Sequence, residues 1–172
     1  MYPEPYIQYL VHFHGDRDYF ECHEILEEYW KRKPAGQRDI YWVGLIQIAV
    51  SLYHYRRQNI KGAVRMMKSA AAILKKEAQA IEQLGLDSKT LLSILLEQLR
   101  DMENRQPYTS MSLPIADPRL ETACISLCHK RNLIWKSSSD LSNPFLLNKH
   151  TLRDRTDVIE ERMRQIKRKQ RF

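Results

Sequence analysis

The stretch that decides the fold is IYWVGLIQIAVSLY, residues 40–53, an almost continuous apolar run. Its fourteen residues are too few to cross a bilayer as a helix, which takes about 20. Asp39, just before the run, is a residue type that caps helix N-termini. We therefore predict a helix over residues 40–57 that is buried in the core of the protein.

Helical periodicity continues on both sides of this run. Apolar residues recur at intervals of three and four, and no segment shows sustained alternation with period two. Helix-ending signals separate the segments at residues 15–16, 33–36, 58–59 and 85. The other predicted helices are residues 4–14, 17–32, 60–84 and 88–104. The sequence thus predicts an all-α protein, with a compact helical bundle of about five helices over residues 1–105.

The region after residue 105 is less regular. Pro107, Pro114 and Pro118 mark a connector over residues 106–119. A partly helical C-terminal extension follows over residues 120–172. We expect a short helix at 120–131, a polar turn-rich stretch at 137–144 and a charged helix at 151–168.

The net charge of the chain is concentrated at one end. The chain has 172 residues and a formal net charge of +7. Residues 1–58 carry a net −1, residues 59–148 a net +3 and residues 149–172 a net +5. A basic terminus can bind nucleic acid, so a nucleic-acid-associated adaptor is one alternative function, although no base-reading or stacking motif accompanies this tail.

Cysteine usage and the start of the chain both indicate the cytoplasm. Three cysteines cannot all pair with one another, and they form no disulfide framework. The first residues have neither a basic nor an apolar segment of the kind that directs secretion. We therefore expect a cytoplasmic protein without a membrane span.

The densest polar cluster of the sequence lies in the predicted helix 17–32, around His23. His23 and Glu27 are four residues apart and share a helix face, where a histidine and a carboxylate can ligate one divalent cation. Glu24 would then be the catalytic base of a metal-dependent hydrolase. In the alternative interpretation, these glutamates form the solvated side of an amphipathic helix, although Phe20 falls on the same side.

A stripe of small and polar residues on the predicted helix 40–57 gives a second indication. It consists of Gly44, Gln47, Ser51 and His54, spaced by three, four and three residues. A buried polar group without a partner costs about 1–3 kcal/mol. We therefore expect the stripe to face the His23 side of helix 17–32. The result would be either a hydrogen-bond network that fixes helix packing or a metal pocket between helices.

The predicted site has three groups of residues. The hypothetical metal ligands are His23, Glu27 and His54, with Glu24 as base, and the cofactor would be a divalent metal ion. The polar cluster around them comprises His12, Gln47, Ser51 and Tyr53. Cys124, Cys128 and His129 could form a second metal site, but two cysteines without another pair are more typical of small buried residues on one helix face.

The order and spacing of these residues resemble the domain-of-unknown-function 309 family of bacteria and archaea. The residues that carry the resemblance are His12-Phe13, Tyr19 to Glu24, Glu27, Trp30, Gly44 to Gln47, Tyr53-His54, Asn59 and Gly62-Ala63. The match covers roughly residues 8–75, and His14 stands where the family usually has Asn. The remainder, from Cys124 to Arg155, is similar to an extension of the bacillus-type members. The resemblance implies a small all-helical fold and no established function.

Three functions therefore compete. We favour a binding or structural role, with a protein partner or a second copy of the chain, because nothing in the sequence identifies a substrate. A metal-dependent hydrolase that uses the His/Glu cluster is the first alternative. A nucleic-acid adaptor that acts through residues 149–172 is the second.

Overall fold

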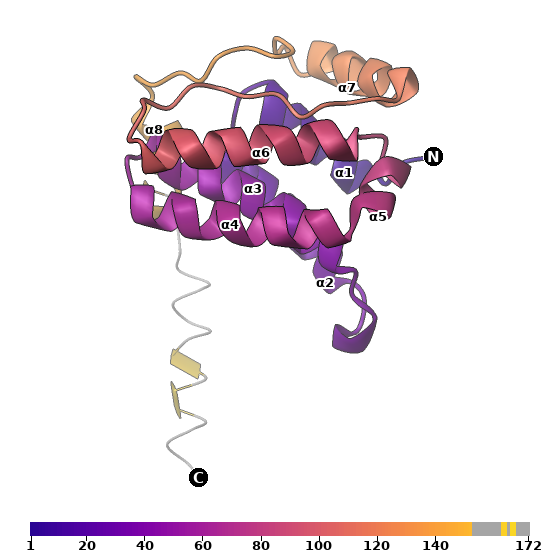
Figure 1. The fold of residues 1–172 in the computed structure, drawn as a ribbon, viewed down its shortest axis with the longest axis horizontal. Helices are drawn as coiled ribbons and strands as arrows, with labels where there is room; N and C mark the ends of the chain where they lie inside the picture. Colours follow the sequence, from indigo (N-terminus) through magenta and orange to yellow (C-terminus); the bar gives the residue numbers. More distant parts are fainter. Residues whose placement is uncertain (153–162, 165, 168–172) are drawn as a thin grey trace.

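The computed structural model describes residues 1–152, 163–164 and 166–167, and within them the protein is all-helical, as predicted (Figure 1). The α-helices are α1 (Glu4–His14), α2 (Tyr19–Lys31), α3 (Ile40–Arg56), α4 (Ile60–Lys76), α5 (Ala78–Gln83), α6 (Ser88–Glu103), α7 (Pro118–Lys130), α8 (Pro144–Leu147) and α9 (Lys149–Leu152). A 3-10 turn, η1 (Ala35–Gln37), lies between α2 and α3. The described residues form no strand, only one isolated bridge between Leu86 and Ile115.

Helix α3 is the centre of the bundle. Its buried residues, among them Trp42, Leu45, Ile48 and Leu52, cover most of its circumference, and it packs on both α2 and α4. In Figure 1 it lies behind α4 and α6. A helix that is apolar nearly all round is stable only when other helices cover it. The apolar run at 40–53 is therefore a buried core helix, as the sequence predicts.

Polar side chains cap most of the helices. Asp18 accepts a hydrogen bond from the backbone N–H of Glu21 at the start of α2 (3.0 Å), and Asn59 caps α4 in the same way. Asp39 was the expected cap of α3, but its side chain makes no capping bond. Its carboxylate instead pairs with Lys33 across η1, with an Nζ–Oδ2 distance of 3.0 Å. The tight turn brings this lysine within reach, a contact that local sequence pattern does not predict.

The predicted helix 60–84 is two helices. Glu77 leaves helical geometry with φ −100° and ψ 24°, so α4 ends at Lys76 and α5 starts at Ala78. The break turns the chain so that Ile81 is fully buried. Next to it, the Tyr6 hydroxyl donates to the Leu84 carbonyl (2.8 Å). Gly85 follows with φ +79°, the left-handed conformation expected where a glycine ends a helix.

Helix α7 covers the outer side of α1. Leu120, Cys124 and Cys128 are buried, and α7 packs on α1. The two cysteines are free, and burial raises the pKa of the Cys124 thiol to about 12. They are therefore small core residues on one helix face, which is the interpretation that the sequence favours over a soft-metal site.

A segment after α7 returns to the other end of α1. We call residues 137–150 the strap. The backbone N–H of Ser137 donates to the His14 carbonyl (3.1 Å), and Arg57 donates to Asn148 (3.2 Å). The strap therefore lies against the ends of α1 and α3, far from its place in the sequence.

The charged helix predicted at 151–168 lies mostly outside the described residues, and its lysine-rich and arginine-rich tail with it. Among the helices that the structure does describe, none combines the length and the apolar character that crossing a bilayer would need.

Candidate functional site

The predicted cluster on α2 lies on the surface of the helix. The His23 Nε2 atom is 2.8 Å from Glu27 Oε2, and His23 Nδ1 is 3.3 Å from Glu24 Oε1. Lys31, one turn further, pairs with Glu27 at 2.7 Å. These three His and Glu side chains are about one-third exposed, at 30%, 36% and 31%. The structure thus brings His23, Glu24 and Glu27 together, as a ladder of close polar contacts open to solvent.

The polar stripe of α3 faces α4, which corrects the expectation that it would face α2. A Cβ on Gly44 would lie 2.7 Å from the Leu74 Cδ2 atom, and the Ser51 hydroxyl donates to the Ala63 carbonyl (2.7 Å). Both neighbours belong to α4. Helical spacing places residues on one face but does not say which helix covers it. Here the missing side chain of Gly44 leaves room for Leu74 and Ile73 of α4.

The remaining members of the stripe have different surroundings. His54 contacts Asn59, the cap of α4, with 3.1 Å between His54 Nδ1 and Asn59 Nδ2. Burial lowers the pKa of His54 below its ordinary value, and the charges of Arg57, His150 and Arg65 lower it further. The buried Oε1 atom of Gln47 has no hydrogen-bond partner. The stripe therefore fixes the packing of α3 on α4 at Ser51 and Gly44.

Aromatic rings connect His23 to the other predicted residues. The Phe20 ring lies 6.2 Å from the His23 ring and 6.1 Å from the Tyr53 ring. Tyr53 in turn contacts His54 and, at 5.4 Å, His150 of the strap. His23, Tyr53 and His54 thus belong to one belt of rings on α2 and α3. Their role as metal ligands or cluster members stays a prediction.

A different set of ligand-type side chains converges where α1 meets α2. Among the described residues, the group of three whose ligand atoms all lie within 4.8 Å of one another is His12, Asp16 and Asp18. His12 Nδ1 is 3.1 Å from both Asp16 oxygens. The site predicted from the sequence included His12 and neither of the two aspartates.

The acceptors of this corner are already engaged. Asp18 caps α2 with one oxygen, and its Oδ2 atom is 2.7 Å from the Lys149 ammonium. Lys149 also contacts Glu21 at 3.1 Å. The exposed fractions of the Lys149 and Asp18 side chains are 16% and 11%. The ammonium thus supplies at this corner the positive charge that a metal ion would otherwise supply, so the geometry favours a structural anchor for the strap.

Two buried arginines make long-range contacts that sequence reasoning missed. Arg17 is 2% and Arg56 is 6% exposed. Arg17 donates to the carbonyls of Ser137 and Met111, and Arg56 donates to the carbonyl of Arg17 (2.7 Å) and lies over the Tyr19 ring at 4.5 Å. No sequence pattern marks either arginine. In the structure, Arg17 follows a turn and adopts φ 56°.

An aromatic pocket opens at the far end of α2. Tyr29, Trp30, Tyr41 and Trp42 line it together with Arg32, Lys33 and three other residues, around a volume of about 370 Å³. We call this cavity the aromatic pocket. The residues of the set are Pro3, Tyr29, Trp30, Arg32, Lys33, Asp39, Tyr41, Trp42 and Leu84. Edge-to-face contacts hold the rings, with 5.4 Å between Tyr29 and Trp42.

Guanidinium groups surround these rings. Arg38 lies 4.9 Å above the Trp30 ring and Arg32 lies 5.4 Å from the Tyr29 ring. Within the described part of the chain, neither of them has a carboxylate oxygen within 4.0 Å. In the sequence, Tyr41 and Trp42 belong to the apolar run that predicts a core helix, and no pattern marked Tyr29 or Trp30 as site residues. The signal that could have marked them is the basic stretch 31–38 next to four aromatic residues.

The fold and these surfaces define a small all-helical protein with a surface ladder of His and Glu side chains. Residues 6–66 match the family model described as domain of unknown function (DUF309). The chain is 54% identical over 169 residues to the uncharacterized protein YpuF of Bacillus subtilis (strain 168). The aligned region covers 98% of this chain and 97% of that protein. The chain therefore belongs to the domain-of-unknown-function 309 family, as the resemblance in its sequence implied.

No solved structure matches the chain. The family assignment agrees with the resemblance on which the sequence predicts a small all-helical fold.

Proposed function

We propose that this protein is a non-catalytic binding protein of the cytoplasm that holds an acidic segment of a partner protein in the aromatic pocket. The observation that carries the proposal is the combination of four aromatic side chains with carboxylate-free guanidiniums at one pocket. Tryptophan, tyrosine and arginine are the residues that contribute most to protein interfaces.

The rings give the pocket a rigid apolar surface. Trp42 is 5% exposed and forms the floor, whereas Tyr29, Trp30 and Tyr41 are partly exposed. Ile40, beside them, has 47% of its surface exposed. Such rings lose little conformational freedom on binding, so an apolar side chain of the partner gains the full benefit of burial there.

The charges around the pocket select the partner. Lys33 is neutralised by Asp39, and Lys31 by Glu27. Arg32 and Arg38 are stacked on rings instead, so their positive charge is available to a carboxylate. An acidic peptide with one or two apolar side chains therefore complements this surface better than a neutral or basic one.

One observation supports the cytoplasm as the location. All three cysteines are free and buried, and a reducing compartment keeps thiols in that state.

The alternative functions stay predictions. Metal-dependent hydrolysis at His23, Glu24, Glu27 and His54 would require bound metal, and nucleic-acid binding would require the basic tail, residues 149–172.

The test is a titration with two synthetic peptides. One consists of glutamates around a leucine–phenylalanine pair, and the other has lysines in place of the glutamates. We expect the acidic peptide to bind and the basic peptide not to bind, measured by isothermal titration calorimetry at low ionic strength. Arg38→Glu should weaken binding at least tenfold.

Arg65→Glu is the matched control. Arg65 is exposed on α4, away from the pocket, and its substitution by glutamate changes the net charge by the same amount as Arg38→Glu. The proposal fails if both variants weaken binding equally, because the effect would then come from net charge alone. It also fails if the two peptides bind with the same affinity.

A further inference from the structure

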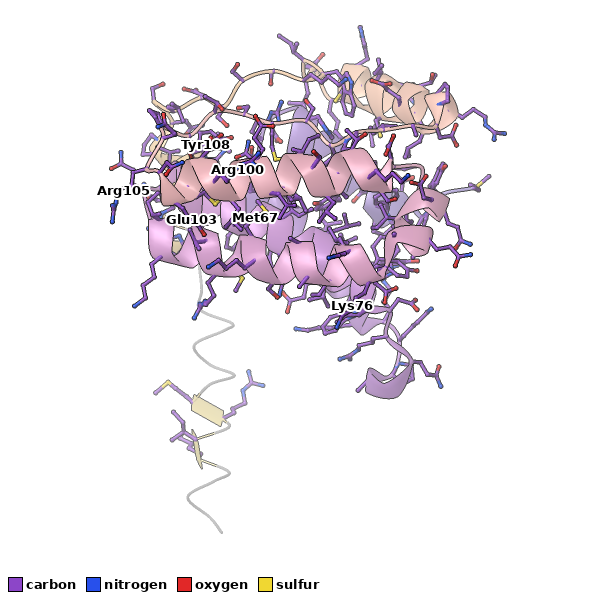
Figure 2. All side chains as sticks on the ribbon, in the orientation of Figure 1. Met67, Lys76, Arg100, Glu103, Arg105 and Tyr108 are labelled. Carbon is purple, nitrogen blue, oxygen red and sulfur yellow. The ribbon has the colours of Figure 1, made fainter. Side chains whose placement is uncertain are left out.

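A second cavity lies at the other end of the bundle, where α3 and α6 end. Its volume is about 420 Å³, a size at which proteins hold small organic molecules. Its polar and aromatic lining residues are Tyr55, Arg56, Gln58, Arg105, Gln106 and Tyr108. Figure 2 shows Arg105 and Tyr108 together at this end, and Lys76 at the opposite end of α4.

The wall of this cavity carries a buried positive charge. The Arg56 guanidinium donates to the carbonyls of Arg17 and Leu146 and to the Ser139 hydroxyl. Its Nε atom is buried without a partner. Within the described residues, neither Arg56 nor Arg17 has a carboxylate oxygen within 4.0 Å. A buried cation normally has a paired anion, so two such cations side by side leave this region electropositive.

The donors that a ligand can reach lie on the rim. Arg105 is exposed and lines the cavity, as do the amides of Gln58 and Gln106. No Asp or Glu is part of this lining. Asp101 lies outside this lining. Burial of Tyr55 raises the pKa of its hydroxyl, and the charge of Asp101 raises it further. The rim therefore offers hydrogen-bond donors and positive charge, with no acidic side chain to compete.

Two tyrosine rings form the apolar side of the cavity. Tyr55 and Tyr108 meet edge to face, with ring centroids 5.7 Å apart and planes at 90°. Both hydroxyl groups are engaged elsewhere: Tyr55 donates to the Gln106 carbonyl (2.6 Å), and Tyr108 contacts Ser139 (2.7 Å). These bonds fix the rings, so their faces and edges remain as a preformed surface for a planar apolar group.

From these features we infer that the cavity binds a small organic oxyanion, a carboxylate or a phosphate carried on a planar apolar body. Arg105 would contact the oxyanion directly, Arg56 and Arg17 would attract it through their field, and Tyr55 and Tyr108 would hold the planar body. This site is separate from the aromatic pocket, and its test does not depend on the peptide-binding proposal.

The experiment is calorimetric titration of the full-length protein with three probes: phenyl phosphate, benzoate and inorganic phosphate. We expect at least one aromatic probe to bind about tenfold or more tightly than inorganic phosphate, because only the aromatic probes contact the tyrosine rings. The tighter of phenyl phosphate and benzoate identifies the oxyanion.

Two variants on the same helix end locate the binding. Arg105→Gln should weaken the tighter aromatic probe about tenfold, the loss expected for one charged hydrogen bond. Arg100→Gln, five residues upstream and also exposed, removes the same charge outside the cavity and should leave binding unchanged (Figure 2). Both residues are exposed, so the melting temperature of each variant should equal that of the parent.

Three results would overturn the inference. The first is that neither aromatic probe binds. The second is equal binding of inorganic phosphate and the aromatic probes, which would mean that the rings contribute nothing. The third is an equal loss of affinity in Arg105→Gln and Arg100→Gln, which would reflect net charge and not the cavity.

Discussion

Arg38 at the aromatic pocket and Arg17 under the strap carry the same guanidinium in opposite surroundings. Arg38 lies on the surface, where it stacks on Trp30 and donates to the exposed carbonyls of Lys33 and Lys31. Arg17 is 2% exposed, and it donates to buried or half-buried carbonyls of the strap and of the segment before α7. A buried cation stabilises the fold only through bonds that replace its hydration. A stacked surface cation keeps its charge available to another molecule. The strap end thus serves mainly stability, whereas the pocket end would serve recognition in the function we propose.

The largest expected effect on stability is at Arg17. Arg17→Met keeps the apolar stem but leaves the carbonyls of Ser137 and Met111 without their donor. We expect a loss of about 3–5 kcal/mol in the free energy of unfolding, because each bond to a charged donor contributes about 1.5–3 kcal/mol. Urea unfolding measures it. Arg38→Met is the control, and an equal loss there would remove the distinction between the two ends.

The next effect is a pH dependence from His14, which lies between α1 and the segment at Leu113. Its Nδ1 atom is 2.8 Å from the Leu10 carbonyl, and its Nε2 atom accepts from the Leu113 N–H (2.9 Å), so the ring is neutral. Burial lowers its pKa from 6.5 to about 3, and Arg17 and Lys136 add to the shift. In the unfolded chain the ring is protonated below its ordinary pKa of 6.5.

Stability from His14 is therefore fully present above pH 6.5 and is lost as the pH falls towards 3. Between pH 6.5 and 4.5 the loss should be about 2–3 kcal/mol, at about 1.4 kcal/mol per pH unit. Urea unfolding at the two pH values measures it. In His14→Gln, which cannot titrate, this slope should become shallower. An unchanged slope would show that other groups cause the pH dependence.

A smaller loss of stability distinguishes two salt bridges, one at the strap and one at the aromatic pocket. Lys149→Met leaves Asp18, 11% exposed in its side chain, without its partner at 2.7 Å. The expected loss is about 1–2 kcal/mol. The pKa of Lys149 is raised by its bonds to Asp18 and Glu21 against the opposing effect of burial. Thermal unfolding at neutral pH measures the change.

The smallest effect is at the other salt bridge. Lys33 and Asp39 pair at 3.0 Å with exposed fractions of 59% and 37%. Solvent screens such a pair, so Lys33→Met should leave the melting temperature unchanged within the precision of the measurement. A drop as large as that of Lys149→Met would contradict the view that only the strap end contributes to stability through its cations.

Periodicity predicted most of the fold because the information is local. The apolar run at 40–53 became the central helix, and the helices over 4–14 and 88–104 were predicted within a residue at each end. The break at Glu77 was missed because it depends on where Ile81 must be buried, a tertiary demand. The prediction that Asp39 caps α3 was wrong for a similar reason. Its carboxylate pairs with Lys33, which the turn between α2 and α3 brings close to it.

The candidate site was harder to predict because its parts are far apart in the sequence. His23, Glu24 and Glu27 meet on one helix face, as spacing alone requires. Their expected counterpart on α3 faces α4, since Ser51 bonds to Ala63. Arg17 and Ser137 are separated by 120 residues, and no local pattern reports a contact of that kind.

The three tryptophans provide the most direct test of the central claim, because two line the aromatic pocket and Trp135 stacks on His14 near the strap. The measurement is a ¹H–¹⁵N spectrum of the tryptophan indole groups during titration with the acidic peptide. We predict that the signals of Trp30 and Trp42 shift with a common saturation curve while that of Trp135 stays fixed. Movement of Trp135 alone, or no movement of any indole signal, would contradict the account.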